Sequence, residues 1–317
     1  MQLKAITRKS AFMAIILLVM MLVAVALRYC FTPFAMELAD SAFRERIVSL
    51  VVAMMIFFGV GIIEGKVLVR SGLSSNFCAL PMPLYGVLAC GVFLSPQTLT
   101  TAAASLCFAL AMLLLLRSLH RAGEKDSVLF FSMLLGITVL LYPPCIVLAA
   151  VIPIAIFTLA LSVRQTILMI IGYLTPLLGA SYVMWYRGDS ILEFGRNLIN
   201  ALMSPRMDAV EEIPYVAIVI VALVTVVLVW GGIFAAVRPD KMFHLARVRR
   251  SLYLFLWVSL VSMTMLLLPS CDLSVCAIVA VPISILLSFV LSILPNNHST
   301  IAYWIILALF VLHLFVE

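Results

Sequence analysis

The chain has 317 residues, of which 65% are apolar and 11% are charged, whereas a soluble domain is about half apolar and about one quarter charged. A fold in water cannot hide so much apolar surface, so a water-soluble domain is excluded. The net charge of +6 is typical of a surface that faces anionic lipid headgroups, and it gives no reason to expect a nucleic-acid partner.

The apolar residues fall into stretches of about 16 to 23, the length that a helix needs to cross a hydrocarbon layer of about 30 Å. We therefore predict an all-α, polytopic transmembrane helical bundle of about 11 spans, forming one integral membrane domain over residues 1–317. The predicted spans lie near residues 11–32, 47–65, 77–95, 99–117, 128–143, 145–163, 166–186, 214–237, 251–269, 273–293 and 300–316.

The basic residues decide the predicted orientation, because cytoplasmic loops collect Lys and Arg during insertion. If the N-terminus is cytoplasmic, most of the 20 basic residues lie on the cytoplasmic side. The outer side then holds only Arg28, Arg44, Arg46, Arg187, Arg196 and Arg206. The acidic residues show the opposite bias, so the cytoplasmic face is basic and the outer face is acidic.

Two predicted outer loops are long, Arg28–Arg46 and Arg187–Pro214. In the second loop, apolar side chains recur at the helical spacing and oppose a polar face, which predicts an amphipathic helix over residues 189–203, lying flat on the outer leaflet. Its apolar stripe consists of Ile191, Leu192, Phe194, Leu198, Ile199, Leu202 and Met203.

The predicted spans carry almost no charge, which argues against coupled transport through buried carboxylates. Glu64, near the inner end of its span, is the exception, and we interpret it as a snorkelling charge or as one paired with Lys66. The four histidines are scattered, and no HExxH motif or carboxylate–histidine cluster occurs. We therefore predict neither a metal site nor a cofactor.

The first outer loop offers the clearest candidates for catalysis. Glu37 and Asp40 are three residues apart, on one face if the segment is helical, with Arg28, Arg44 and Arg46 nearby. A carboxylate can serve as general base to an acceptor while guanidinium groups hold a phosphate leaving group. The alternative is a solvated loop whose acidic and basic side chains compensate one another. The residues alone favour this solvated loop over a catalytic site.

Tyr182, Trp185 and Tyr186 precede Arg187 at the start of the second outer loop. They are candidates for stacking on a sugar or an isoprenoid chain, with Arg187 beside them. The default interpretation of such a group is an aromatic belt at the membrane interface.

Several segments together resemble a known family. They are NFCALPMPLYGVLACGVFLSPQTLT, a span ending in LLRSLHR, GITVLLYPPCIVLAAVIPIAIF, GYLTPLLGASYVMWYRGD and ARVRRSLYLFLWVSL. Their order, from about residue 50 onward, is similar to a family of uncharacterised polytopic inner-membrane proteins of Bacteroidota. The resemblance implies a multi-pass protein of the bacterial inner (cytoplasmic) membrane.

That family in turn resembles, distantly, the GT-C superfamily of polyprenyl-phosphate-sugar-dependent glycosyltransferases. In that superfamily the catalytic carboxylate lies in the outer loop after the first helix, a position that Glu37 or Asp40 would match here. The loop in this chain is short and lacks the adjacent acidic pair common in the superfamily.

Two functional hypotheses follow. The first is a GT-C-like glycosyltransferase, or a degenerate relative, that acts on a lipid-linked sugar at the outer face. The second is a non-catalytic structural or accessory subunit of an envelope assembly or lipid-handling machine. The expected partners are the lipid bilayer, a polyprenyl-phosphate-linked substrate and other envelope proteins.

Overall fold

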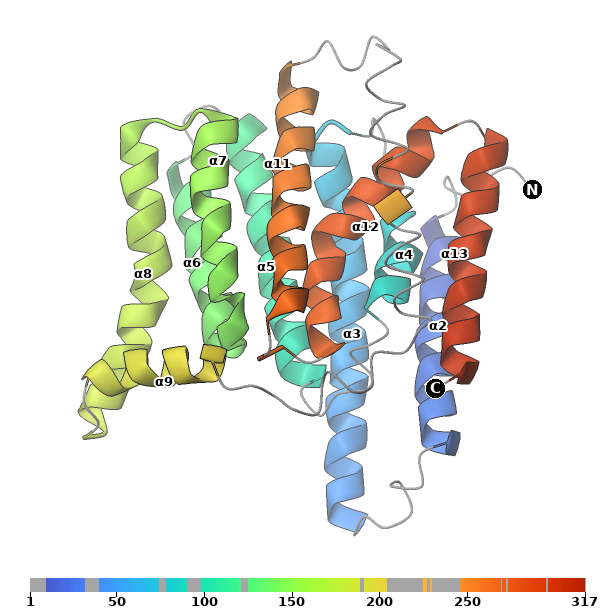
Figure 1. The fold of residues 1–317 in the computed structure, drawn as a ribbon, viewed down its shortest axis with the longest axis horizontal. Coiled ribbons are helices and arrows are strands. Elements are labelled where there is room, and N and C mark those ends of the chain that lie inside the picture. The colour runs from blue at the N-terminus through green and yellow to red at the C-terminus, as the bar shows by residue number, and fades with distance from the viewer. Residues whose placement is uncertain are drawn as a thin grey trace.

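The computed structural model describes residues 10–31, 40–73, 78–89, 98–120, 125–188, 191–203, 225–226, 229, 246–268, 270–271, 273–294 and 296–316. Within these residues every regular element is a helix, which confirms the predicted all-α class (Figure 1). The α-helices are α2 (Ser10–Phe31), α3 (Asp40–Arg70), α4 (Pro81–Leu88), α5 (Thr98–His120), α6 (Lys125–Leu141), α7 (Val151–Leu159), α8 (Val163–Tyr186), α9 (Ile191–Met203), α11 (Ala246–Thr264), α12 (Cys276–Ile293) and α13 (Asn296–Val316). The 3-10 helices are η3 (Pro143–Ala150), η6 (Met265–Leu267) and η7 (Leu273–Val275).

Three helices in the described part of the chain are long and apolar enough to cross a membrane. They contain Val48–Arg70, Leu99–Arg117 and Val163–Tyr186. Shorter apolar helices cover Phe12–Val23, Asp126–Leu141, Pro143–Leu159 and Cys276–Ser292. Such a bundle is compatible with a membrane protein.

The second predicted span is longer than the sequence suggests. We predicted residues 47–65, but α3 covers Asp40–Arg70, which is about 46 Å at 1.5 Å per residue. Our prediction ended the span at charged residues, yet a charged residue ends an apolar stretch without ending a helix. An acidic first residue with Arg four positions later even favours helix formation. Part of the predicted first outer loop is therefore helical.

The third predicted span, 77–95, does not form one crossing helix in the described residues. α4 has eight residues, about 12 Å of helix, and begins at Pro81, a position that suits proline because the first helical N–H needs no partner within the helix. Residues 81–87 are all buried. α4 is thus a short helix enclosed by the bundle.

The short turn predicted around Tyr142–Pro144 is confirmed. α6 ends at Leu141, Tyr142 is extended with φ −141° and ψ 98°, and the prolines then begin η3. η3 continues into α7, which ends at Ala160 in the left-handed conformation with φ 51°. The next helix, α8, begins with a capping box between Ser162 and Gln165, so its first N–H groups are satisfied locally.

The two ends of the bundle differ (Figure 1). α3 and α5 end, and α8 and α11 begin, near one end of the bundle. These helix ends carry Arg70, Arg117, Arg164 and Arg249, so we call this the basic end. α3 and α5 begin, and α8 ends, at the other end, where α9 lies across the direction of the other helices; we call this the α9 end. The chain enters α2 at the basic end and leaves α13 at the α9 end.

One predicted span lies almost entirely outside the described residues. It is the one at 214–237, of which only residues 225, 226 and 229 are described. The helices on either side of it are placed: α9 lies at the α9 end, and α11 begins at the basic end (Figure 1).

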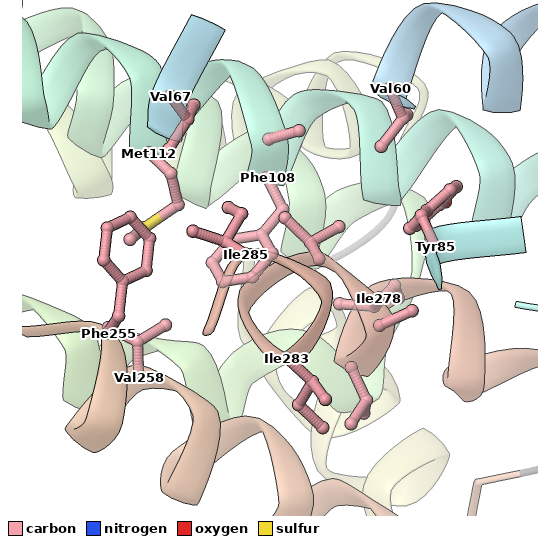
Figure 2. Packing of buried hydrophobic residues seen from close by; sticks show 14 of the residues in the cluster. Val60, Val67, Tyr85, Phe108, Met112, Phe255, Val258, Ile278, Ile283 and Ile285 are labelled. Atoms are coloured by element: carbon pink, nitrogen blue, oxygen red, sulfur yellow. The ribbon is translucent and has the colours of Figure 1, made fainter. Parts of the chain in front are cut away.

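The core is built where α12 packs against α3, α4, α5 and α11. Figure 2 shows Phe108 of α5 against Ile285 of α12, and Met112 of α5 beside Phe255 of α11. All four side chains are at most 1% exposed. α12 therefore lies at the centre of the bundle.

α6 and α8 approach each other through small residues. A Cβ at Gly136 would lie 2.5 Å from Pro176 Cγ and 2.6 Å from the Tyr173 carbonyl oxygen. A Cβ at Gly172 would meet Ser132 Oγ and would lie 2.8 Å from the Leu129 carbonyl oxygen. Small residues let helix backbones approach closely where the surroundings are apolar.

This contact gives a matched test on one helix. Gly172→Ala should destabilise the protein by about 1 to 3 kcal/mol, because the added methyl overpacks the contact with α6. Gly179→Ala is the control, since a Cβ there meets nothing within 4 Å and alanine favours helix. The measurement is thermal unfolding of the purified protein in mild detergent. Equal melting temperatures for the two variants would contradict the close approach.

Candidate functional site

Of the two predicted catalytic residues, the structure describes the position of Asp40, which begins α3 at the α9 end. Glu37 lies outside the described residues. Arg28 lies in the last turns of α2, and Asp40, Arg44 and Arg46 lie in the first two turns of α3. Their side chains are not among those described. What the structure adds is the helical position of Asp40 and Arg44, which share a face because they are four residues apart.

The predicted aromatic group is described in full. Tyr182, Trp185 and Tyr186 end α8 and are 62%, 53% and 80% exposed. The rings of Tyr182 and Trp185 lie with their centroids 5.7 Å apart at an angle of 40°. The Arg187 backbone N–H donates to the carbonyls of the last turn, and its side chain is exposed. The structure brings these four residues together at the α9 end.

The predicted amphipathic helix is confirmed as α9, over Ile191–Met203. Phe194, Leu198 and Leu202 are half-buried, and Leu198 packs against the bundle core. Ile199 and Met203 are instead 58% and 72% exposed. The apolar stripe is therefore wider than its contact with the bundle, and its outer edge is open to the surroundings of the protein.

Our interpretation of Glu64 is wrong. The Glu64 side chain is 0% exposed, so it does not snorkel. Lys66 is exposed, and residues two apart on an α-helix do not face each other, so the two side chains do not pair. Among the described residues, Glu64 is the one acidic or basic side chain that is fully buried.

Glu64 contacts a helix that is remote in sequence. Ser284 Oγ on α12 lies 2.8 Å from Glu64 Oε2. The same hydroxyl lies 3.0 Å from the Val281 carbonyl oxygen of its own helix. Glu64 Oε1 is buried and accepts no hydrogen bond from any described group. One carboxyl oxygen is thus bound between α3 and α12, and the other is enclosed without a donor.

A second pair of hydroxyls lies close to this contact. The Tyr85 hydroxyl on α4 donates to Ser105 Oγ on α5 over 3.1 Å, and Ser105 donates to the Ala102 carbonyl over 2.8 Å. The Tyr85 ring lies with its centroid 5.8 Å from that of Phe57, which precedes Glu64 by seven residues on α3. α4 approaches α3 closely at Gly61, where an added Cβ would lie 3.1 Å from Met82 Cγ. Four helices therefore surround a small polar centre.

The sequence contains one signal for this centre. Ser284, Ser288 and Ser292 recur at intervals of four residues in a helix whose other residues are apolar, which marks a polar side of α12. Nothing in the sequence pairs that side with Glu64, which is 220 positions away.

Comparison of the chain with protein-family models, with curated proteins and with solved structures gives no match. The resemblance described from the sequence thus stays a prediction. Within the described residues, no group of three or more His, Cys, Asp or Glu side chains is placed to hold a metal ion.

Two of the three serines of α12, Ser284 and Ser288, allow a matched test of the Glu64 contact. Each donates to a carbonyl of its own helix, but only Ser284 also touches the carboxyl group. Ser284→Ala should cost about 1 to 3 kcal/mol of stability, because it leaves a buried polar group without its partner. Ser288→Ala should cost less. Chemical or thermal unfolding in mild detergent measures both, and a larger loss for Ser288→Ala would contradict the assignment.

Proposed function

We propose that the chain is a multi-pass protein of the bacterial inner membrane with about 11 spans and a cytoplasmic N-terminus. The long apolar helices support this proposal. So does the gathering of Arg70, Arg117, Arg164 and Arg249 near the end of the bundle where α2 begins, because cytoplasmic segments are rich in basic residues. The α9 end then faces the periplasm, and α9 lies at the outer membrane–water interface.

We further propose that the protein is a GT-C-like glycosyltransferase, or a degenerate relative, acting on a lipid-linked sugar at that outer face. The observation that carries the proposal is the grouping at the α9 end. An amphipathic helix with exposed Ile199 and Met203, an exposed aromatic group on α8 and the acidic start of α3 all lie there. Apolar side chains at an interface suit a polyprenyl chain, and aromatic faces suit a sugar ring.

The proposed reaction needs one base and one phosphate clamp. The acceptor hydroxyl attacks the anomeric carbon of the donor, its proton passes to the carboxylate, and the bond from that carbon to the phosphate oxygen breaks. The polyprenyl phosphate leaves as an anion held by guanidinium groups. Glu37 or Asp40 supplies the base, Arg28, Arg44 and Arg46 form the clamp, and Tyr182, Trp185, Tyr186 and Arg187 bind substrate.

The second candidate is a non-catalytic accessory subunit of an envelope assembly. It is favoured by Ile199 and Met203, which no other described element covers and which also fit a partner helix. Purification in mild detergent followed by mass spectrometry separates the two candidates. A stoichiometric partner supports the accessory role, and a monodisperse protein without one argues against it.

Replacement of the acidic residues tests the glycosyltransferase proposal. In a strain without its own copy of the gene, Glu37→Ala or Asp40→Ala should lower the affected surface glycan at least tenfold, and the double variant should abolish it, because the base is lost. Glu193→Ala is the control, an exposed acidic residue of α9 at the same end. Full restoration of surface glycans by the double variant would refute catalysis by this pair.

Cysteine accessibility tests the orientation. Arg196 of α9 and Arg117 of α5 are both exposed but lie at opposite ends of the bundle. In intact spheroplasts, a membrane-impermeant maleimide should label Arg196→Cys above the wild-type background. Arg117→Cys should be labelled only after permeabilisation. The reverse pattern would invert the proposed topology.

A further inference from the structure

We infer that Glu64 and Ser284 form a proton-binding site inside the bundle, in which the Glu64 carboxyl group holds an exchangeable proton and donates it to Ser284 Oγ. The site joins α3 to α12 and is separate from the residues proposed for glycosyl transfer. Neither the topology nor the proposed reaction requires it, so the inference goes beyond the proposed function.

Among the described side chains, no counter-charge accompanies the burial of Glu64. Glu64 is fully buried, and its hydrogen-bond partner is a neutral hydroxyl. An ionised carboxylate placed among apolar groups loses its hydration, and this loss is offset only by a cation or by several donors. Within the described residues, Oε1 has no donor and Oε2 has Ser284 alone. The surroundings therefore do not solvate a carboxylate.

Ser284 has too few hydroxyl hydrogens to serve both of its close oxygen neighbours. Ser284 has one hydroxyl hydrogen, and its oxygen lies 2.8 Å from Glu64 Oε2 and 3.0 Å from the Val281 carbonyl oxygen. If that hydrogen serves Val281, as serine commonly does within helices, the shorter contact needs a hydrogen from Glu64. A neutral carboxylic acid supplies it. The chain from the acid to Ser284 and on to Val281 then gives each hydroxyl hydrogen an acceptor, and Glu64 Oε1 stays without a donor.

The other described groups around the Glu64 carboxyl supply no positive charge to it. α4 contributes Tyr85, whose hydrogen is donated to Ser105 of α5. The described side chains of α2, at residues 12–23, include no titratable group, and α12 contributes the hydroxyl of Ser284. On α3, Lys66 is exposed, and on α5, Cys107 is partly exposed. Among the described side chains, no cation is positioned to neutralise an ionised Glu64.

We expect the proton on Glu64 to affect how α12 packs against α3. Pro282 lies inside α12, two residues before Ser284, and proline removes one backbone hydrogen bond from a helix interior. The helix is thus weakened next to the contact. Loss of the proton would leave two carboxylate oxygens with one shared hydrogen, so we expect the α3–α12 contact to loosen when Glu64 ionises.

Infrared spectroscopy of the full-length protein in lipid nanodiscs tests the site directly. A protonated carboxylic acid gives a carbonyl band that a carboxylate lacks. At neutral pH we expect this band in the wild-type protein, a downward shift in D2O, and its absence in Glu64→Gln. Glu193→Gln, at an exposed position on α9, is the control and should keep the band. A wild-type band that is missing, or that persists in Glu64→Gln, would overturn the proposal.

A second variant guards against misfolding of Glu64→Gln. Ser284→Ala keeps the acid but removes its acceptor, so the carbonyl band should remain and move to higher frequency. Ser288→Ala should leave the band where it is. An unmoved band in Ser284→Ala would show that Glu64 does not donate to Ser284. A band that does not respond to D2O would show that the proton is not exchangeable.

Discussion

Every polar group inside this apolar bundle must find its partner within the protein, and the fold depends on this constraint. Many of the buried hydroxyls meet it within their own helix. Thr138, Ser259 and Ser288 each donate to the carbonyl four residues earlier in their own helix. An ionised carboxylate on α3 would have no such local solution, because the helix carbonyls accept hydrogen bonds and offer none. Glu64 therefore depends on α12, and this contact ties a helix near the start of the chain to one near its end.

The same constraint explains the close approach of the helices. Where helices lie in apolar surroundings, burial of apolar area contributes little to their association, and tight contact between small residues contributes more. Gly136 and Gly172 bring α6 and α8 together, and Gly61 admits α4 beside α3. The short helix α4 is enclosed in this way, and it carries Tyr85 to the polar centre. The polar residues of α9 have no place inside such a bundle, which accounts for the position of α9 across its end.

Helix positions could be predicted from hydropathy and prolines, as α2, α5, α8 and the turn at Tyr142 show. Two kinds of information were missing from the sequence. Charged residues such as Asp40 and Arg44 limit an apolar stretch, but they did not show that α3 continues through them. Contacts between residues that are far apart in the sequence could not be predicted either. Glu64 was therefore paired with Lys66, which is close in sequence, and not with Ser284. The group at Tyr182–Arg187 was predicted because it is local, and the roles of Glu37 and Asp40 stay predictions.

We propose that this protein works at the α9 end, in contact with lipid. A cryo-electron microscopy structure in nanodiscs that contain polyprenyl phosphate tests this claim most directly. It should show α9 at the level of the lipid headgroups, with an elongated density against Ile199 and Met203 that extends toward the start of α3. A structure with α9 in water beyond the lipid layer, and with polyprenyl density only at the basic end, would contradict the account.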